Sequence, residues 1–160
     1  MTNESTSSAY LTFMLGDEKF AIPVSSVQEI VELDYVTKVP QTPDYMLGII
    51  NLRGKILPLL DTRLKLGLPS TERTKKNRIL ILDIQETAKA TQVGAIVDVA
   101  REVVEIDSRQ IQKSEDFEHY KDTTPITGIV NNQGDITMIM DIARVFSVND
   151  LDKISQTLNK

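Results

Sequence analysis

The sequence predicts a mainly β protein in which two small five-stranded barrels pack together, with short helical turns and a C-terminal helix. Short apolar segments rich in Ile, Leu and Val recur between turn residues along most of the chain. Aromatic residues make up only 5% of the chain, so the core must rest on these aliphatic residues, which favour strands. One such segment occurs twice, which indicates that the architecture is doubled.

The repeat relates residues 48–61 to residues 128–141. Both segments place Gly, Asn, Gly and Asp at the same spacing, without a gap. Further upstream, residues 27–33 resemble residues 100–106. What the copies share is expected to be scaffold, and what they do not share is a candidate for function. Arg53 is such a difference, because its counterpart is Gln133.

The first copy follows a Ser/Thr-rich segment, residues 1–8, that is expected to be a disordered tail. Apolar runs on either side of Gly16–Lys19 predict a pair of strands joined by a turn. Residues 25–27 are expected to form a tight turn. Residues 28–33 fit a helix or a strand, and their β-branched counterpart at residues 102–106 favours the strand.

The repeated hairpin is the centre of the first copy. Residues 35–39 are expected to be extended, and a Pro at the first position favours one helical turn over residues 43–47. Continuous apolar runs within residues 48–61 suit strands that are covered on both faces. Arg53-Gly54 can close a tight turn between them, because Gly tolerates positive φ. Residues 62–67 predict a short helix that ends at Gly67.

A polar linker is expected at residues 68–78, so the halves of the domain are predicted at residues 9–67 and 79–146. The basic cluster Arg73–Arg78 is interpreted as a solvated part of this linker. Residues 147–160 are predicted to carry the last helix. The other elements of the second half are strands at 79–84, 93–98 and 102–106, a surface loop at 113–124, the hairpin at 128–141 and a helical turn at 142–146.

Composition and charge restrict the function. The chain has 18 Lys and Arg against 23 Asp and Glu, for a net charge of −5, which argues against nucleic-acid binding. Because the chain has no Cys, disulfides, thiolate zinc sites and cysteine nucleophiles are excluded. The single His, His119, lies in an acidic segment that is expected to be an exposed loop, so no catalysis, metal or cofactor is expected.

Two acidic residues, Glu29 and Glu32, could be read as a catalytic pair. Their counterparts Glu102 and Glu105 favour a repeated, solvent-facing pattern instead. The N-terminal residues lack the apolar stretch of a signal peptide, so the protein is expected to be cytoplasmic. These observations together favour a binding module over an enzyme.

The segment Gly48–Arg63, with its Asn-Leu-Arg-Gly turn, resembles the signature of the CheW family of chemotaxis coupling proteins. Leu15–Glu18 and Val27–Ile30 match the same family in register, and the resemblance spans residues 9–146. It implies SH3-like barrels and a non-catalytic adaptor that couples chemoreceptors, the methyl-accepting chemotaxis proteins, to the histidine kinase CheA. The implied partners are the cytoplasmic tip of the receptor and the regulatory domain of the kinase. Recruitment to membrane-associated receptor arrays is implied as well.

By motif match, Val27, Glu29, Gly48 and Arg53 take the positions of the family's receptor-interaction residues. The resemblance implies apolar contact at Val27, close approach at Gly48 and a planar hydrogen-bonding fork at Arg53. A solvated turn residue stays the alternative for Arg53. For the whole chain, the alternatives are a scaffold of a non-flagellar chemosensory pathway and a small-molecule-binding barrel.

Overall fold

The computed structural model describes residues 6–84, 91–114 and 125–146. Its elements follow one another in this order: β1 (Ser7–Leu15), β2 (Glu18–Pro23), the 3₁₀ turn η1 (Val24–Ser26), β3 (Val27–Glu32), β4 (Met46–Leu52), β5 (Lys55–Asp61), α1 (Thr62–Lys65), β6 (Arg78–Ile84), β7 (Thr91–Val97), β8 (Val99–Asp107), the 3₁₀ turn η2 (Ser108–Gln110), β9 (Ile111–Lys113), β10 (Ile126–Asn132), β11 (Asp135–Met140) and α2 (Ile142–Val145).

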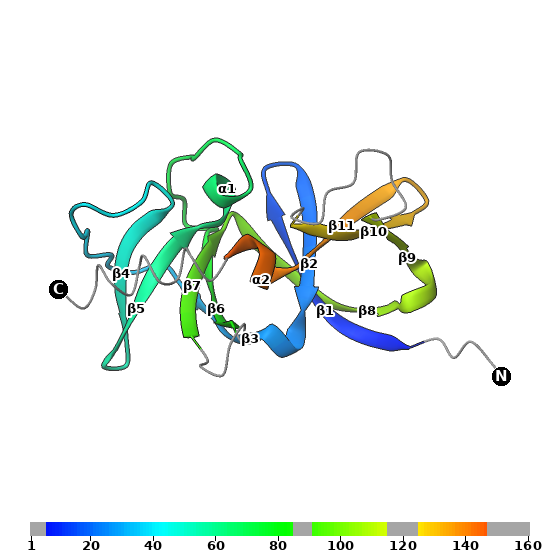
Figure 1. Cartoon of the computed structure of the whole chain (residues 1–160), viewed down its shortest axis with the longest axis horizontal. Helices are drawn as coiled ribbons and strands as arrows, with labels where there is room; N and C mark the ends of the chain where they lie inside the picture. The colour runs from blue at the N-terminus through cyan, green and yellow to red at the C-terminus, as the bar shows by residue number, and fades with distance from the viewer. Residues whose placement is uncertain (1–5, 85–90, 115–124, 147–160) are drawn as a thin grey trace.

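These strands form two sheets, which lie side by side along the long axis of the molecule (Figure 1). One sheet has six strands in the order β8-β1-β2-β11-β10-β9, and the other has five in the order β3-β6-β7-β5-β4. The mainly β fold predicted from the sequence is therefore confirmed. The sixth strand of the larger sheet, β9, was not expected, because three residues are too short to show a period.

Two local expectations were wrong. The predicted tail at residues 1–8 overlaps β1, because Ser7 already pairs with Asp107 of β8. The helical turn predicted at residues 43–47 is a turn followed by a strand, in which the Met46 N–H donates to Pro43 O at 3.0 Å. Burial of Met46 against the core outweighs the weak helix signal from the Pro. The C-terminal helix predicted at residues 147–160 and His119 lie outside the described residues, as does most of the surface loop predicted at residues 113–124.

The two halves of the chain exchange strands. β1 and β2, from the first half, complete the sheet of β8 to β11, while β6 and β7 complete the sheet of β3, β4 and β5. The chain crosses between the sheets through η1 and again at Asp98, between β7 and β8. The boundary expected at residues 68–78 therefore does not separate the sheets, since β5 and β6 on either side of it belong to the same one.

The exchange preserves the repeat that the sequence predicts. Where strands of different halves meet in parallel, β2 pairs with β11 and β7 pairs with β5. A bridge between Thr37 and Ile49 extends the five-stranded sheet beyond β4. The pairing of Gln112 in β9 with Ile129 in β10 is its counterpart in the other sheet. Each sheet thus contains one set of equivalent strands, drawn from both halves.

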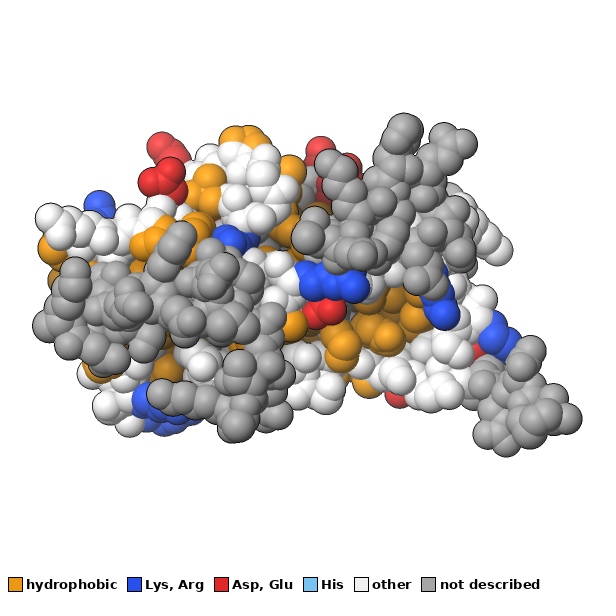
Figure 2. Space-filling model, viewed as in Figure 1, with side chains coloured by type: hydrophobic (Ala, Val, Ile, Leu, Met, Phe, Trp, Pro, Cys, Tyr) orange, Lys and Arg blue, Asp and Glu red, His pale blue; other side chains and the backbone are white. Residues whose placement is uncertain are grey.

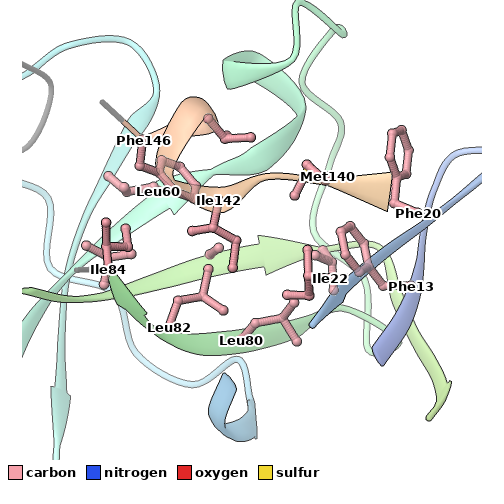
Figure 3. Close-up of a cluster of buried hydrophobic side chains, with 14 of the residues drawn as sticks. Phe13, Phe20, Ile22, Leu60, Leu80, Leu82, Ile84, Met140, Ile142 and Phe146 are labelled. Atoms are coloured by element: carbon pink, nitrogen blue, oxygen red, sulfur yellow. The ribbon is translucent and has the colours of Figure 1, made fainter. Parts of the chain in front are cut away.

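One large core joins the two sheets (Figure 3). Phe13 and Phe20 stack with ring centroids 5.8 Å apart on the side of the six-stranded sheet. Leu80, Leu82 and Ile84 of β6 contribute from the other sheet. The intervening Ile79 and Ile81 face a second core within the five-stranded sheet, so both faces of β6 are buried, as its continuous apolar run requires. The shared core and the exchanged strands tie the two sheets into one body.

Candidate functional site

The hairpin of β4 and β5 ends in Arg53 and Gly54, as predicted. Both residues have positive φ, 51° and 88°, which is the conformation of a tight two-residue hairpin turn. The Asn51 side chain stabilises the turn, because its Oδ1 accepts a hydrogen bond from the Gly54 N–H at 2.8 Å. Asn131 and Gly134 repeat this bond at 2.9 Å in the second hairpin. The turn is therefore shared scaffold, and the Arg side chain is not.

The guanidinium of Arg53 reaches across to Glu29 on β3. Arg53 Nη1 donates to Glu29 Oε2 at 3.2 Å, and Nη2 pairs with Oε1. The hydrogen bond from Arg53 lowers the pKa of Glu29, and the same bond raises the pKa of Arg53. Both groups are thus charged at neutral pH, and the structure brings together two residues that the sequence singled out separately. The counterpart of this pair would be Glu102 and Gln133, which cannot form an ion pair.

This pairing changes the interpretation of both residues. Arg53 is 70% exposed, but its fork is held in one place by the carboxylate instead of moving freely in solvent. Glu29 is 34% exposed, so it does not follow the solvent-facing pattern that its counterpart Glu102 suggested. Glu32, the other member of the possible catalytic pair, is 83% exposed and lies 3.7 Å from Arg78. The two acids therefore lie near different arginines and do not form a pair.

Gly48 has a scaffold role within the sheet. Its φ is 151°, and a Cβ at this position would lie 2.2 Å from Thr37 O. Thr37 and Ile49 exchange two backbone hydrogen bonds, of 2.9 and 2.8 Å, which hold the intruding carbonyl in place. A Cβ on the equivalent Gly128 would lie 2.5 Å from Ile111 Cγ2. The close approach expected at Gly48 is thus made by the chain itself, and contact of Gly48 with a partner stays a prediction.

Val27 begins β3 and is half-buried against the core that joins the sheets. Two exposed apolar residues near it were missed by the sequence reasoning. Ile30 on β3 is 43% exposed, and Tyr35, just beyond the strand, is 77% exposed. The sequence alone gave no signal for Ile30, because only the structure shows that it shares the outward face of β3 with the polar residues Gln28 and Glu32. Their exposure leaves both side chains accessible to another protein.

A groove of about 400 Å³ lies beside Arg53. Apolar residues of three strands line it, among them Val31, Ile50 and Leu52, and Tyr35 stands at its side. Arg53 forms part of the same lining, as do the acidic residues Glu32 and Asp34, so the groove combines apolar and charged side chains. Such a surface can bind an amphipathic segment, but it presents no nucleophile with an adjacent base.

A second hollow, of about 580 Å³, lies between β1, β11 and α2. The acidic residues of this hollow stabilise the fold: Asp141 accepts a hydrogen bond from Ala143 N at 3.0 Å to cap α2, and Asp83 accepts one from Gln28.

Figure 2 shows apolar side chains exposed on one face over the six-stranded sheet, next to basic and acidic groups. Within residues 6–84, 91–114 and 125–146, no group of His, Asp or Glu side chains is arranged to hold a metal ion.

The comparison with known proteins decides the family. The model of the CheW-like domain matches residues 9–150. The chain belongs to the CheW family. This confirms the resemblance on which the residues above were selected.

Relatives extend over most of the chain. Chemotaxis protein CheW of Bacillus subtilis (strain 168) is 32% identical over 142 residues, which cover 88% of each chain. Chemotaxis protein CheW of Klebsiella aerogenes is 28% identical over 151 residues, 94% of this chain and 89% of the relative. The crystal structure of the scaffolding protein TtCheW from Thermoanaerobacter tengcongensis superposes with a TM-score of 0.77 at 30% identity, covering 91% of this chain and 96% of that one.

This CheW-family chain is a chemotaxis scaffold and not an enzyme, as the sequence predicted. The groove beside Arg53 agrees with that role, because it offers apolar and charged side chains together to a protein segment. In the parts of the chain that the structure describes, no helix is long and apolar enough to cross a membrane.

Proposed function

We propose that this protein couples chemoreceptors to the histidine kinase CheA by holding both on one rigid body. The observation that carries the proposal is the Arg53–Glu29 pair, which only one of the two copies can form, beside a partly apolar groove. A shared core and two exchanged pairs of strands fix the sheets to one another. A partner bound to one sheet is therefore held at a fixed position relative to a partner bound to the other.

The receptor contact is proposed at Val27, Glu29, Gly48 and Arg53, with Ile30 added from its exposure. Arg53 donates two hydrogen bonds to Glu29. Its remaining N–H groups can donate to carbonyl or carboxylate oxygens on the receptor's helical tip. Because Glu29 already orients the fork, binding loses less side-chain entropy than it would with a mobile Arg. Val31, Ile50 and Leu52 in the groove supply apolar contact for the hydrophobic face of a helix.

The contact with the kinase is proposed at the ends of the barrels. Ile56 follows the first hairpin turn and is 51% exposed, and Ile136 occupies the same place after the second turn with 48% exposure. Exposed apolar residues at equivalent positions give the molecule two related surfaces. A kinase regulatory domain of the same fold could meet such surfaces in a pseudo-symmetric way.

The proposal places this protein at membrane-associated receptor arrays, bound through its partners. Its test is recovery of the tagged protein from the native cell, followed by identification of what co-elutes. Both a chemoreceptor and a CheA-type kinase are expected in the eluate. Recovery of neither would contradict the coupling function, and the identity of the recovered kinase would separate flagellar output from that of another chemosensory pathway.

A further inference from the structure

The loop between α1 and β6 carries a concentration of positive charge that the coupling function does not use. Arg73, Lys75, Lys76 and Arg78 fall within six residues, in a chain whose net charge is −5. The side chains of Arg73 and Arg78 are each 33% exposed, and both lysines are exposed. From the sequence alone, this cluster was interpreted as a solvated part of a linker. The structure shows instead how the loop is held and which charges it exposes.

Hydrogen bonds hold the loop in a defined shape. Asn77 is only 6% exposed, and its Oδ1 accepts a bond from the Thr74 N–H at 2.9 Å. The Asn77 N–H donates back to Thr74 O at 3.2 Å, which closes the turn around the two lysines. Asn77 Nδ2 donates to the backbone O of Asp98 at 3.1 Å, and Asp98 is where the chain crosses between the sheets. The lysines are therefore presented from a fixed turn anchored in the body of the protein.

The charges of this loop are only partly neutralised. Arg73 lies 3.6 Å from Asp61, which is buried, and Arg78 lies 3.7 Å from Glu32. Glu72, next to Arg73, is the single acidic residue of the loop itself. Neither lysine ammonium makes a hydrogen bond or an ion pair with another described residue. These ammonium groups remain available for a partner's negative charges.

The loop borders a hollow of about 560 Å³, whose lining includes Leu33, Arg73, Lys75 and Arg78. Glu32 lines this hollow and also the groove beside Arg53. A protein segment lying in that groove could therefore continue onto the basic loop. The arrangement combines a concave surface, fixed cationic groups and a direct connection to a groove that suits a protein segment.

We propose that the basic loop, residues 73–78, is a docking surface for an acidic stretch of a protein partner. Its carboxylates would meet Arg73, Lys75 and Arg78, which line the hollow, and Lys76, which is exposed on the same turn. A protein is favoured over nucleic acid, because the acidic remainder of the chain repels a long polyanion and the loop offers too few cations to offset it. This proposal concerns residues outside the receptor site, and it can fail or succeed independently of the coupling function.

The test titrates the full chain with a fluorescent peptide of about ten glutamates at low ionic strength, where surface attraction is least screened. Lys75→Glu with Lys76→Glu should weaken binding about tenfold or more, because two attractive contacts become repulsive. The matched control is Arg101→Glu with Lys113→Glu, which makes the same charge change at exposed positions of the other sheet. The control should change the affinity less than about twofold.

A melting curve of each variant accompanies the titration, and Lys75→Gln with Lys76→Gln replaces the charge reversal if the latter does not fold. The neutral pair should still weaken binding about threefold. The proposal is overturned if the parent does not bind the peptide or if the control variant loses as much affinity as the loop variant. It is also overturned if an oligothymidylate of equal length binds more tightly than the peptide, which would assign the loop to nucleic acid.

Discussion

The guanidinium of Arg63, in α1, binds the carboxylate of Asp98, where the chain crosses from the five-stranded sheet to the six-stranded one. Arg63 Nε donates to Asp98 Oδ1 at 3.0 Å, and Nη2 pairs with Oδ2. The Gly16 N–H, in the turn between β1 and β2, also donates to Asp98 Oδ2, at 2.6 Å. A single carboxylate thus fastens elements of both sheets at the crossing.

Removal of the Arg63 side chain should destabilise the protein. Its side chain is 13% exposed and that of Asp98 is 24% exposed, so the pair is better shielded than a surface ion pair. Arg63→Ala is expected to lower the free energy of unfolding by about 1–3 kcal/mol, measured by urea denaturation. Arg63→Lys should restore only part of this, because an ammonium cannot reproduce the two parallel bonds. A loss below about 0.5 kcal/mol would show that the pair does not stabilise the crossing.

Low pH should remove the stabilisation that the Arg63–Asp98 pair provides. The hydrogen bond from Arg63 lowers the pKa of Asp98 below its ordinary value of 3.8. A carboxyl whose pKa is lower in the folded state stabilises the fold fully above its unfolded pKa and loses that contribution as the pH falls through its folded pKa. The free energy of unfolding, measured from neutral pH down to about pH 3, should therefore fall less steeply below about pH 4 in Asp98→Asn than in the parent. Equal slopes would contradict this assignment.

The exchange of strands predicts that neither half folds alone. A fragment of residues 1–67 would lack β6 and β7, and a fragment of residues 68–160 would lack β1 and β2. Each should give poorly dispersed amide resonances and expose apolar surface of the shared core. Mixing the two fragments should restore the dispersed spectrum, because the missing strands are then supplied. If the first fragment is well folded by itself, its strands must pair differently from those described.

The exchange also marks the limit of prediction from this sequence. Apolar runs and turn residues are local signals, so the strands, both hairpins and the short helix at Gly67 could be predicted. Which copy a strand joins depends on tertiary packing, and two similar copies offer β1 nearly equivalent partners. The linear boundary at residues 68–78 was the simplest choice, and the sheets divide the chain differently.

The candidate site was predictable to a similar extent. Glu29 and Arg53 could be selected by motif, but their contact joins residues that are 24 positions apart and requires the fold. The steric reason for a Gly at position 48 was not predictable for the same reason, since the atom that excludes a side chain there is Thr37 O on another segment. Ile30 was overlooked because its exposure depends on the orientation of β3. The residue types of the site could be predicted from the sequence, but the contacts between them could not.

The hairpin glycines should differ in the cost of substitution. A Cβ on Gly54 or Gly134 would meet no atom within 4 Å, so only the positive φ, 88° or 91°, opposes a side chain. Gly54→Val and Gly134→Val should each lower the free energy of unfolding by about 1 kcal/mol or more through backbone strain. Gly48→Ala should cost more, about 2 kcal/mol or above, because its Cβ also meets backbone. Thermal or urea unfolding measures all three, and equal losses would contradict the contact at Thr37.

Arg53→Ala should separate binding from stability. Because the Arg53 side chain is exposed, its removal should leave the melting temperature nearly unchanged. An arginine at the centre of an interface can contribute about 2 kcal/mol or more to binding, so receptor-tip affinity should fall on the order of thirtyfold. Arg53→Lys should recover part of the affinity, since a single ammonium cannot bridge Glu29 and the receptor together. Titration with the receptor hairpin and a melting curve are the two measurements.

Gln133→Ala is the matched control for Arg53→Ala, because Gln133 occupies the same turn position with φ of 54° against 51°. It removes a side chain from an equivalent turn without removing an ion pair, so receptor affinity should change little. Glu29→Gln completes the set: it keeps the size of the side chain but releases the Arg53 fork, and it should weaken binding less than Arg53→Ala does. If Arg53→Ala binds the receptor like the parent, the pair is a surface ion pair without a role in binding. If it unfolds the protein, Arg53 is structural, and the receptor contact must lie elsewhere on the sheet.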